Sequence, residues 1–302
     1  MATDRGKVLV TGATGFIGMR LITSLLHEGY AVRCLVRRPE TSLPHGAERV
    51  HADLLEPATL GAACAEVDTA YYLVHSMAGG RAGFERRDRQ AAENFVAAAD
   101  RAGVRRVIYL GGLGEAGEIL SEHLASRMEI ARILRTGRFS TTVLRAAIII
   151  GAGGASFEMI RSLVERLPVM ITPRWVSTRC QPIAVGDVIR YLVGCLKEER
   201  TAGETFDIGG PEILTYREMM ERFARVERRP LLIVPVPLLT PKLSSYWVGL
   251  ITPVKPSIAM PLIEGLCNEV ICGDRRIREI IPFPLTSYDE AVRIALAEGG
   301  VK

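Results

Sequence analysis

The sequence predicts an α/β fold, a doubly wound parallel sheet with a smaller C-terminal lobe. Short apolar segments alternate with segments of helical length through the first half of the chain. Aromatic residues make up only 6% of the chain while aliphatic residues dominate, which suits a sheet covered by helices on both faces. A glycine-rich turn also lies between the first apolar strand and the first amphipathic helix.

The first strand is expected at residues 7–11 and the first helix at about residues 16–28. In the turn between them, Gly12 can adopt a tight conformation, Gly15 lets the main chain approach a pyrophosphate, and Gly18 lets helix and sheet pack closely. Free amides at the helix start would face the phosphates. The spacing is GxxGxxG, so the strand and helix around it carry the prediction of a dinucleotide site. The residues expected at the cofactor are Gly12, Thr14, Gly15, Phe16, Ile17 and Gly18.

Further strands and helices predict how the chain is divided. Strands are expected at residues 31–36, 50–52, 70–74, 106–110 and 141–144, and a helix at 84–102 that ends at Gly103. The pattern becomes irregular from Gly151, but a helix before residue 196 and a strand at 204–208 predict a return to the sheet. We therefore assign residues 1–150 and 178–210 to a dinucleotide-binding Rossmann domain, and 151–177 and 211–302 to a substrate-side lobe.

Composition limits the classes of function. The chain has 302 residues, of which 48% are hydrophobic, so it can bury a large core. Its net charge of +4 is mild and its basic residues are scattered, which argues against nucleic acid as a partner. The six cysteines form no CxxC pair, so we expect reduced, packed thiols, no metal site and a cytoplasmic protein without a secretory signal.

The most lipophilic region is residues 231–266. Its prolines cut it into pieces too short to cross a bilayer as one helix, so we expect no transmembrane segment. We interpret the region as the wall of a cavity for a small-molecule substrate, with a membrane-surface element as the alternative. For residues 242–252, internal packing, contact with a second subunit and peripheral membrane contact all stay open.

Several motifs together resemble the extended and atypical short-chain dehydrogenase/reductase superfamily. They are the glycine-rich turn, Ala52-Asp53-Leu54, the PIAVGDV segment at 182–188 and the TFDIGG segment at 205–210. The segments at 72–77 and 243–247 are similar to the uncharacterised bacterial YbjT-like and NAD-dependent epimerase/dehydratase-like members, which are related to NmrA-like proteins. This resemblance implies a Rossmann fold that binds NAD(P).

The second strand is followed by Arg37 and Arg38, where an NAD-preferring site would place an acidic residue. Two guanidinium groups can pair with a 2′-phosphate, so we predict NADP(H), with NAD(H) as the alternative. The two arginines could instead be only the basic end of an exposed strand. The resemblance implies that Asp53, beside Leu54, approaches the adenine amino group; its other interpretation is a helix cap.

The superfamily's usual catalytic groups are missing. The resemblance implies a serine or threonine after the fifth strand and a YxxxK pair on the next helix, but this chain has Gly111-Gly112 and the pair His123 and Arg127. One helical turn separates His123 from Arg127, so they share a face. Histidine can exchange a proton near neutrality, and arginine can hold a ribose hydroxyl or a phosphate.

His75 is a second candidate, because it follows the fourth strand at the edge where open α/β sheets bind ligands. His75, His123 and Arg127 are therefore the candidate catalytic residues, and His75 and Arg127 are also expected beside the cofactor. Asn94 has the position of a superfamily asparagine that steadies the site, although an exposed polar residue is its stronger interpretation. Gly151, Gly153 and Gly154 are expected to leave the backbone free around a ligand.

Three functions follow in order. The first is an NADP(H)-dependent oxidoreductase that acts on a small, rather apolar substrate through the HxxxR site. The alternative is a non-catalytic protein that binds NADP(H) as a structural ligand or a redox signal, which the loss of serine, tyrosine and lysine favours. A sugar-nucleotide epimerase or dehydratase comes third, because the resemblance implies the YxxxK pair for those enzymes as well.

Overall fold

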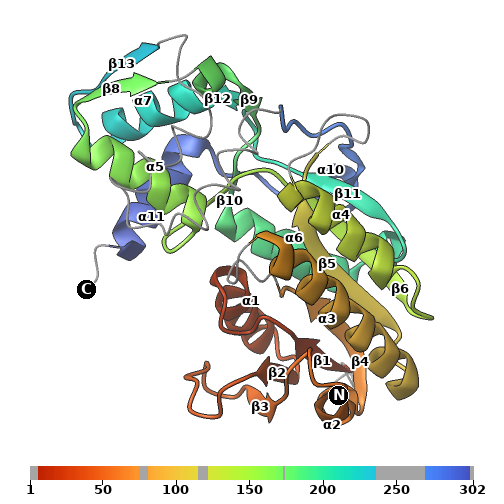
Figure 1. Ribbon diagram of the computed structural model, residues 1–302. Helices are drawn as coiled ribbons and strands as arrows, with labels where there is room; N and C mark the ends of the chain where they lie inside the picture. Colours follow the sequence, from red (N-terminus) through yellow and green to blue (C-terminus); the bar gives the residue numbers. More distant parts are fainter. Residues whose placement is uncertain (1–5, 75–80, 115–121, 173, 236–268, 300–302) are drawn as a thin grey trace.

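Within the residues that the structure describes (6–74, 81–114, 122–172, 174–235 and 269–299), seven parallel strands form a central sheet (Figure 1). The structure is a computed structural model. The strand order is β11-β6-β5-β4-β1-β2-β3, so the direction of winding reverses between β1 and β4 and the predicted doubly wound fold is confirmed. The strands are β1 (Lys7–Val10), β2 (Val32–Val36), β3 (Glu48–His51), β4 (Val67–Tyr72), β5 (Arg106–Gly112), β6 (Ser140–Ala146) and β11 (Thr205–Ile208).

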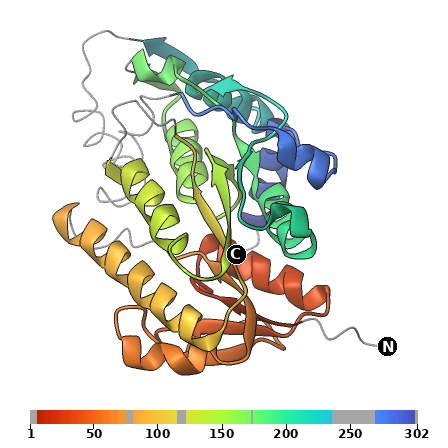
Figure 2. The ribbon, with the colours of Figure 1, turned by 90° about the vertical axis from the view of Figure 1, so that its right-hand side faces the viewer.

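Alternating side chains divide the core between the two faces of the sheet. In β1, Val8 and Val10 pack in one hydrophobic cluster, whereas Leu9 between them belongs to a cluster on the opposite face. Figure 2 shows the two layers of helices on opposite sides of the sheet. The first face is covered by α1 (Phe16–His27) and α6 (Val185–Lys197), and the second by α2 (Pro57–Cys64), α3 (Arg81–Ala102) and α4 (Glu122–Leu134).

A third hydrophobic cluster lies beyond the carboxyl edge of the sheet. It gathers α5 (Ala155–Arg166), α7 (Tyr216–Val226) and α11 (Tyr288–Gly299). Three strand pairs accompany these helices: β7 (Ile149–Ile150) with β10 (Ile183–Ala184), β9 (Arg179–Cys180) with β12 (Leu214–Thr215), and β8 (Val169–Thr172) with β13 (Leu232–Pro235). Strand β11 pairs with β6 of the central sheet, which confirms that the chain returns to the sheet at the strand predicted for residues 204–208. The domain boundaries stay a prediction.

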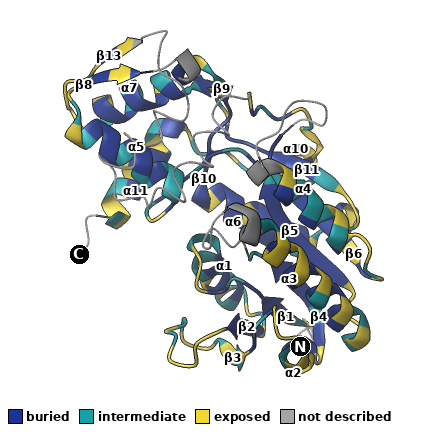
Figure 3. Cartoon of the chain, in the orientation of Figure 1, coloured by how far each residue is buried: buried dark blue, intermediate teal, exposed yellow. Residues whose placement is uncertain are grey.

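The C-terminal part returns to both regions. The short helix α10 (Arg276–Ile280) places Ile277 in the hydrophobic cluster on the α1 and α6 face of the sheet. Helix α11, the last described element, packs in the third cluster. Figure 3 shows that the strands of the central sheet are mostly buried, while β8 and β13 present an exposed face. Among the described helices, none is long and apolar enough to cross a membrane. Most of residues 231–266 lie outside the described residues, so the cavity wall predicted there stays a prediction.

Candidate functional site

In the turn between β1 and α1, two of the three glycines are sterically required, and the third has little free space. Gly12 has φ +67°, and a Cβ there would lie 2.6 Å from the carbonyl oxygen of Leu73 after β4. A Cβ on Gly18 would collide with the carbonyl oxygen of Gly12 and lie 2.9 Å from that of Ala13. A Cβ on Gly15 would lie 3.2 Å from the same Gly12 oxygen. The main chain therefore folds back on itself closely at Gly12 and Gly18, and at the three glycines no side chain covers the backbone.

The start of α1 presents free backbone amides. The Gly15 amide donates to the Gly12 carbonyl over 3.0 Å, and the Met19 amide donates to the Gly15 carbonyl over 3.1 Å. Between them, the amides of Phe16, Ile17 and Gly18 have no acceptor within the part of the chain that the structure describes, and no side chain caps the helix. Bare backbone, free amides and the positive end of the helix dipole fit a dinucleotide pyrophosphate.

The side chain of Phe16 has a packing role. A Cβ on Gly151 or Gly154 would lie 3.1 or 3.0 Å from the Phe16 Cζ, so the ring occupies the space beside these glycines. Gly151 is also closed by Val185, whose Cγ1 would lie 2.6 Å from the added Cβ. The expectation that Gly151 and Gly154 leave the backbone free around a ligand is therefore wrong, because protein side chains fill that space. The predicted contact of Phe16 with a cofactor then belongs to its amide.

Arg37 and Arg38 follow β2 directly, and both are exposed. Their guanidinium groups make no hydrogen bond or ion pair with any residue that the structure describes. Their carbonyl groups are held, however: the His51 ring donates to the Arg37 oxygen over 3.0 Å, and the Thr41 hydroxyl donates to the Arg38 oxygen over 2.8 Å. Two guanidinium groups on a fixed backbone are suited to bind the 2′-phosphate of NADP(H). The choice of NADP(H) over NAD(H) stays a prediction.

The loop after β3 is fixed from two sides. The Asp53 carboxylate accepts a hydrogen bond from the Leu55 amide over 2.9 Å, so it caps the loop before α2 while its side chain stays partly exposed. Leu54 is buried, and its carbonyl oxygen accepts a hydrogen bond from the Asn94 amide group over 2.8 Å. Asn94 is thus partly buried and steadies this loop, so its interpretation as an exposed polar residue is wrong.

Arg127 lies at the carboxyl end of β5. Its Nη1 donates to the carbonyl oxygen of Leu110 over 3.0 Å, and its own carbonyl accepts the Tyr109 hydroxyl over 3.2 Å. Its Nε is buried and has no hydrogen-bond partner within the described residues. Burial raises the pKa of Tyr109, against the lowering effect of the Arg127 charge, so this hydroxyl stays protonated at neutral pH. Arg127 thus has an unused donor beside the β5 edge, and its contact with a cofactor stays a prediction.

The two candidate histidines cannot be placed. His75 lies outside the described residues, and His123 belongs to α4 but its side chain is outside the described part. The helix itself confirms that His123 and Arg127 are one turn apart. Their catalytic roles stay predictions.

Three buried polar side chains join the C-terminal segment to β11, to α6 and to the chain between β9 and β10. Asp187 accepts from the Thr286 amide over 2.7 Å, Asp207 accepts from the Gly273 amide over 3.0 Å, and Gln181 accepts from the Cys272 amide over 3.1 Å. None of the three was a candidate residue in the sequence. In the sequence, each of these side chains is recognisable only as a polar residue within an apolar run. Their hydrogen-bond partners lie 66 to 99 residues away in the chain.

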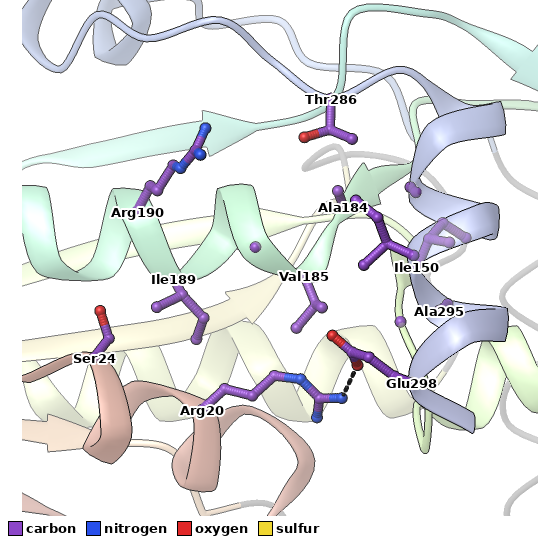
Figure 4. Close-up of a pocket in the computed structure, with 14 residues that line it drawn as sticks. Arg20, Ser24, Ile150, Ala184, Val185, Ile189, Arg190, Thr286, Ala295 and Glu298 are labelled. Atoms are coloured by element: carbon purple, nitrogen blue, oxygen red, sulfur yellow. Dashed lines mark hydrogen bonds and ion pairs between the residues drawn. The ribbon is translucent and has the colours of Figure 1, made fainter. Parts of the chain in front are cut away.

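A pocket of about 360 Å³ lies where α1, α6 and α11 meet. Figure 4 shows aliphatic side chains of Ile150, Val185 and Ile189 along it, with the ion pair of Arg20 and Glu298 at one side. It lies on the α1 and α6 face of the sheet. No group of three or more His, Cys, Asp or Glu residues that could hold a metal occurs among the described residues.

Known proteins are similar to this chain in sequence and in fold. A family model described as NAD(P)H-binding matches residues 12–150, which contain the glycine turn, Arg37, Arg38 and Asp53. A short-chain dehydrogenase/reductase superfamily protein from Agrobacterium tumefaciens, solved with bound NAD, superposes with a TM-score of 0.69 over 97% of each chain at 17% identity. In its motifs and its fold the chain is similar to the extended and atypical short-chain dehydrogenase/reductase superfamily. NAD(P)(H) is its cofactor, in keeping with the NAD(P)H-binding model that matches residues 12–150.

Two curated relatives have related sequences. The 3 beta-hydroxysteroid dehydrogenase/Delta 5-->4-isomerase of Mycobacterium tuberculosis is 34% identical over 119 residues, which are 36% of this chain and 32% of that protein. The ceramide reductase of Caulobacter vibrioides is 30% identical over 198 residues, 64% of this chain and 62% of that protein. The match to the first relative thus spans about a third of that protein's length, and to the second less than two thirds. The resemblance to the superfamily implies a YxxxK pair, and this chain has His123 and Arg127 at those positions.

Proposed function

We propose that the protein is an NADP(H)-dependent oxidoreductase of the atypical type, acting on an apolar carbonyl or hydroxyl compound through a non-standard site. The observation that carries the proposal is the amide cradle at the start of α1, together with the guanidinium groups of Arg37 and Arg38 beyond β2, none of which has a partner among the described residues. The relatives support the reaction class, because their names describe a dehydrogenase and a reductase. Those names also mention a hydroxysteroid and ceramide, which supports an apolar substrate.

In this proposal the cofactor supplies hydride transfer, and the protein supplies binding and orientation. The amides of Phe16, Ile17 and Gly18 would hold the pyrophosphate, and Arg37 and Arg38 the 2′-phosphate. Asp53 would accept from the adenine amino group with its remaining carboxylate oxygen. The unused Nε of Arg127 would donate to a ribose hydroxyl at the β5 edge. His123 or His75 would exchange the proton with the substrate oxygen.

The alternative is a protein that binds NADP(H) without turning over a substrate. Two observations favour it: β5 ends at Gly111-Gly112 where a catalytic hydroxyl is expected, and Arg127 already donates to the Leu110 carbonyl. A sugar-nucleotide epimerase or dehydratase stays third, because the YxxxK pair is replaced here as well.

We also propose a cytoplasmic location, supported by free, buried cysteines at all five positions that the structure describes. Peripheral contact with a membrane surface is supported by one exposed face. Val169 and Ile171 of β8 pair with Leu232 and Val234 of β13, and these four side chains are 41–58% exposed. Cosedimentation with phosphatidylglycerol vesicles tests this contact, and a Val169→Ser, Leu232→Ser variant should cosediment less.

Two measurements on one preparation separate the two functions. Thermal shift with NADPH and NADP⁺ reports binding, and stopped-flow oxidation of NADPH with a panel of apolar ketones and aldehydes reports turnover. Stabilisation followed by oxidation that a His123→Ala or Arg127→Met change reduces at least tenfold supports the oxidoreductase. Stabilisation without oxidation of any compound supports the binding protein, and no stabilisation contradicts both.

A further inference from the structure

Arg20 lies in the second turn of α1, and its side chain joins three separate parts of the molecule. Its Nη1 donates to the carbonyl oxygen of Phe16 over 3.1 Å, and its Nη2 donates to the carbonyl oxygen of Ala152 over 3.0 Å. The same Nη2 lies 2.7 Å from the carboxylate of Glu298 in α11 (Figure 4). One half-buried guanidinium therefore connects the start of α1, the turn at residues 151–154 and the C-terminal helix.

The ring of Phe16 completes this contact. The Arg20 guanidinium lies over it, 4.8 Å from the ring centroid, and the ring fills the space beside Gly151 and Gly154. Phe16 is also the first residue of α1, and its amide is the first of the three without an acceptor among the described residues. The ring of Phe16 thus lies against the turn at residues 151–154 and its carbonyl accepts from Arg20, while its amide belongs to the phosphate cradle.

We propose that Arg20 is a positioning residue for the dinucleotide turn, through which helix α11 contributes to cofactor affinity. Amides bind phosphate only when they point at it, and α1 has no side-chain cap that fixes its first turn. Arg20 fixes the first turn of α1 by binding the Ala152 carbonyl and the Glu298 carboxylate. The inference depends on dinucleotide binding and is independent of any turnover.

The choice of ligands distinguishes this role from the role proposed for Arg37 and Arg38. NADPH and NADH share the pyrophosphate, so Arg20→Met should weaken both by the same factor, about fivefold or more. The fragment 2′-AMP lacks a pyrophosphate, so its affinity should change less than twofold. Glu298→Gln keeps the bonds of Arg20 to the two carbonyls and should give a smaller, equal loss for NADPH and NADH.

The opposite end of α1 offers a matched control. Lys197 of α6 forms an ion pair of 2.7 Å with Glu28, which directly follows α1. Lys197→Met removes an ion pair between α1 and its surroundings far from the glycine turn, and should leave the affinity for NADPH within twofold of the unchanged protein. Fluorescence titration with NADPH, NADH and 2′-AMP gives the affinities, and thermal unfolding without ligand shows whether each variant is folded.

The coupling must also act in the other direction. Addition of NADPH should slow amide hydrogen exchange in α11 at residues 288–299, and Arg20→Met should abolish that protection even at saturating NADPH. Unchanged NADPH affinity in a folded Arg20→Met protein overturns the proposal. So does an equal loss of 2′-AMP affinity, because that would indicate general loosening of the domain.

Discussion

Gly18 determines how closely α1 can approach the end of β1. A Cβ at this position would collide with the Gly12 carbonyl oxygen and crowd that of Ala13, both of which are backbone atoms that cannot turn away. Gly186 offers a contrast within α6, because a Cβ there would meet no atom within 4 Å. The same residue type is thus required in one helix start and dispensable in another.

We predict that Gly18→Ala lowers both stability and cofactor affinity. The added methyl group must displace α1, which costs about 1–3 kcal/mol of unfolding free energy as an overpacked site, and the displaced amides should bind NADPH at least tenfold more weakly. Gly186→Ala is the control and should leave NADPH affinity unchanged without lowering stability, because alanine is favoured over glycine in a helix where its methyl group meets no atom. Chemical denaturation and NADPH titration measure them, and a Gly18→Ala protein that binds NADPH normally contradicts this assignment.

Arg37 and Arg38 are predicted to select the nucleotide. Their side chains have no partner among the described residues, so replacing both by alanine should leave folding intact and remove only the interaction with a 2′-phosphate. NADPH affinity should fall about tenfold or more, since each charge-assisted hydrogen bond contributes about 1.5–3 kcal/mol, while NADH affinity changes little. Isothermal titration with both nucleotides checks this, and equal losses would exclude the assignment.

Helices α7 and α11 are joined by a cluster of charged side chains. Arg222 of α7 lies within 2.6 Å of both Glu212, which precedes α7, and Asp289 of α11, and Glu212 also accepts the Tyr288 amide over 2.9 Å. Burial acts to raise the pKa of Glu212, but the hydrogen bonds from Arg222 and Tyr288 lower it below its ordinary value of 4.5. The ionised form of Glu212 is therefore the one that binds Arg222 of α7 and the Tyr288 amide of α11.

This direction fixes the pH dependence. A carboxyl group with a lowered pKa stabilises the fold fully above its ordinary pKa and loses that effect as pH falls through the folded value. Glu212→Gln should therefore lower the melting temperature at pH 7, on the order of 2 °C. The difference from the unchanged protein should shrink as pH falls below 4.5. Melting curves from pH 7 to pH 3 test this, and a difference that grows towards low pH would refute it.

The elements near the N-terminus were predictable because their signals are local. The apolar run of β1, the stripe of α1 and the glycines between them are close in sequence, and α1 is observed at Phe16–His27 against an expected 16–28. Gly103 ends α3 with φ +72°, as expected of a C-terminal glycine. Strand β4 begins three residues earlier than expected because Asp68 and Thr69 interrupt the apolar run at its start, and it ends two residues earlier because the apolar Leu73 and Val74 lie past the end of the strand.

The site was predictable only in part, because its remaining contacts depend on distant residues. The bond from Arg20 to Ala152 spans 132 residues, and that from Thr286 to Asp187 spans 99. Nothing local in the sequence shows that Phe16 fills the space beside Gly151, so these glycines were misinterpreted as free backbone. The role of Asn94 needed the position of Leu54, which lies 40 residues away.

Burial in the hydrophobic core shields the described thiols of the molecule from solvent. Cys34, Cys64, Cys180, Cys195 and Cys272 are all buried and free. Burial raises the pKa of the Cys34, Cys180 and Cys272 thiols to about 12 and that of the Cys64 and Cys195 thiols to about 11. At pH 8 these thiols are protonated and out of reach of a reagent.

We predict that a Cys267→Ser variant, which leaves only these five, reacts negligibly with Ellman's reagent at pH 8 while folded. All five thiols should react after denaturation in guanidinium. The absorbance at both stages gives the count directly. Rapid reaction of one or more thiols in the native protein would contradict their burial.

We propose that the glycine turn and the two arginines together bind NADP(H), and titration of the purified protein with NADPH and with NADH, followed by native mass spectrometry, is the decisive experiment. We expect one nucleotide bound to each chain and an affinity for NADPH about tenfold or more above that for NADH. Absence of binding by both nucleotides, or a preference for NADH, would contradict it.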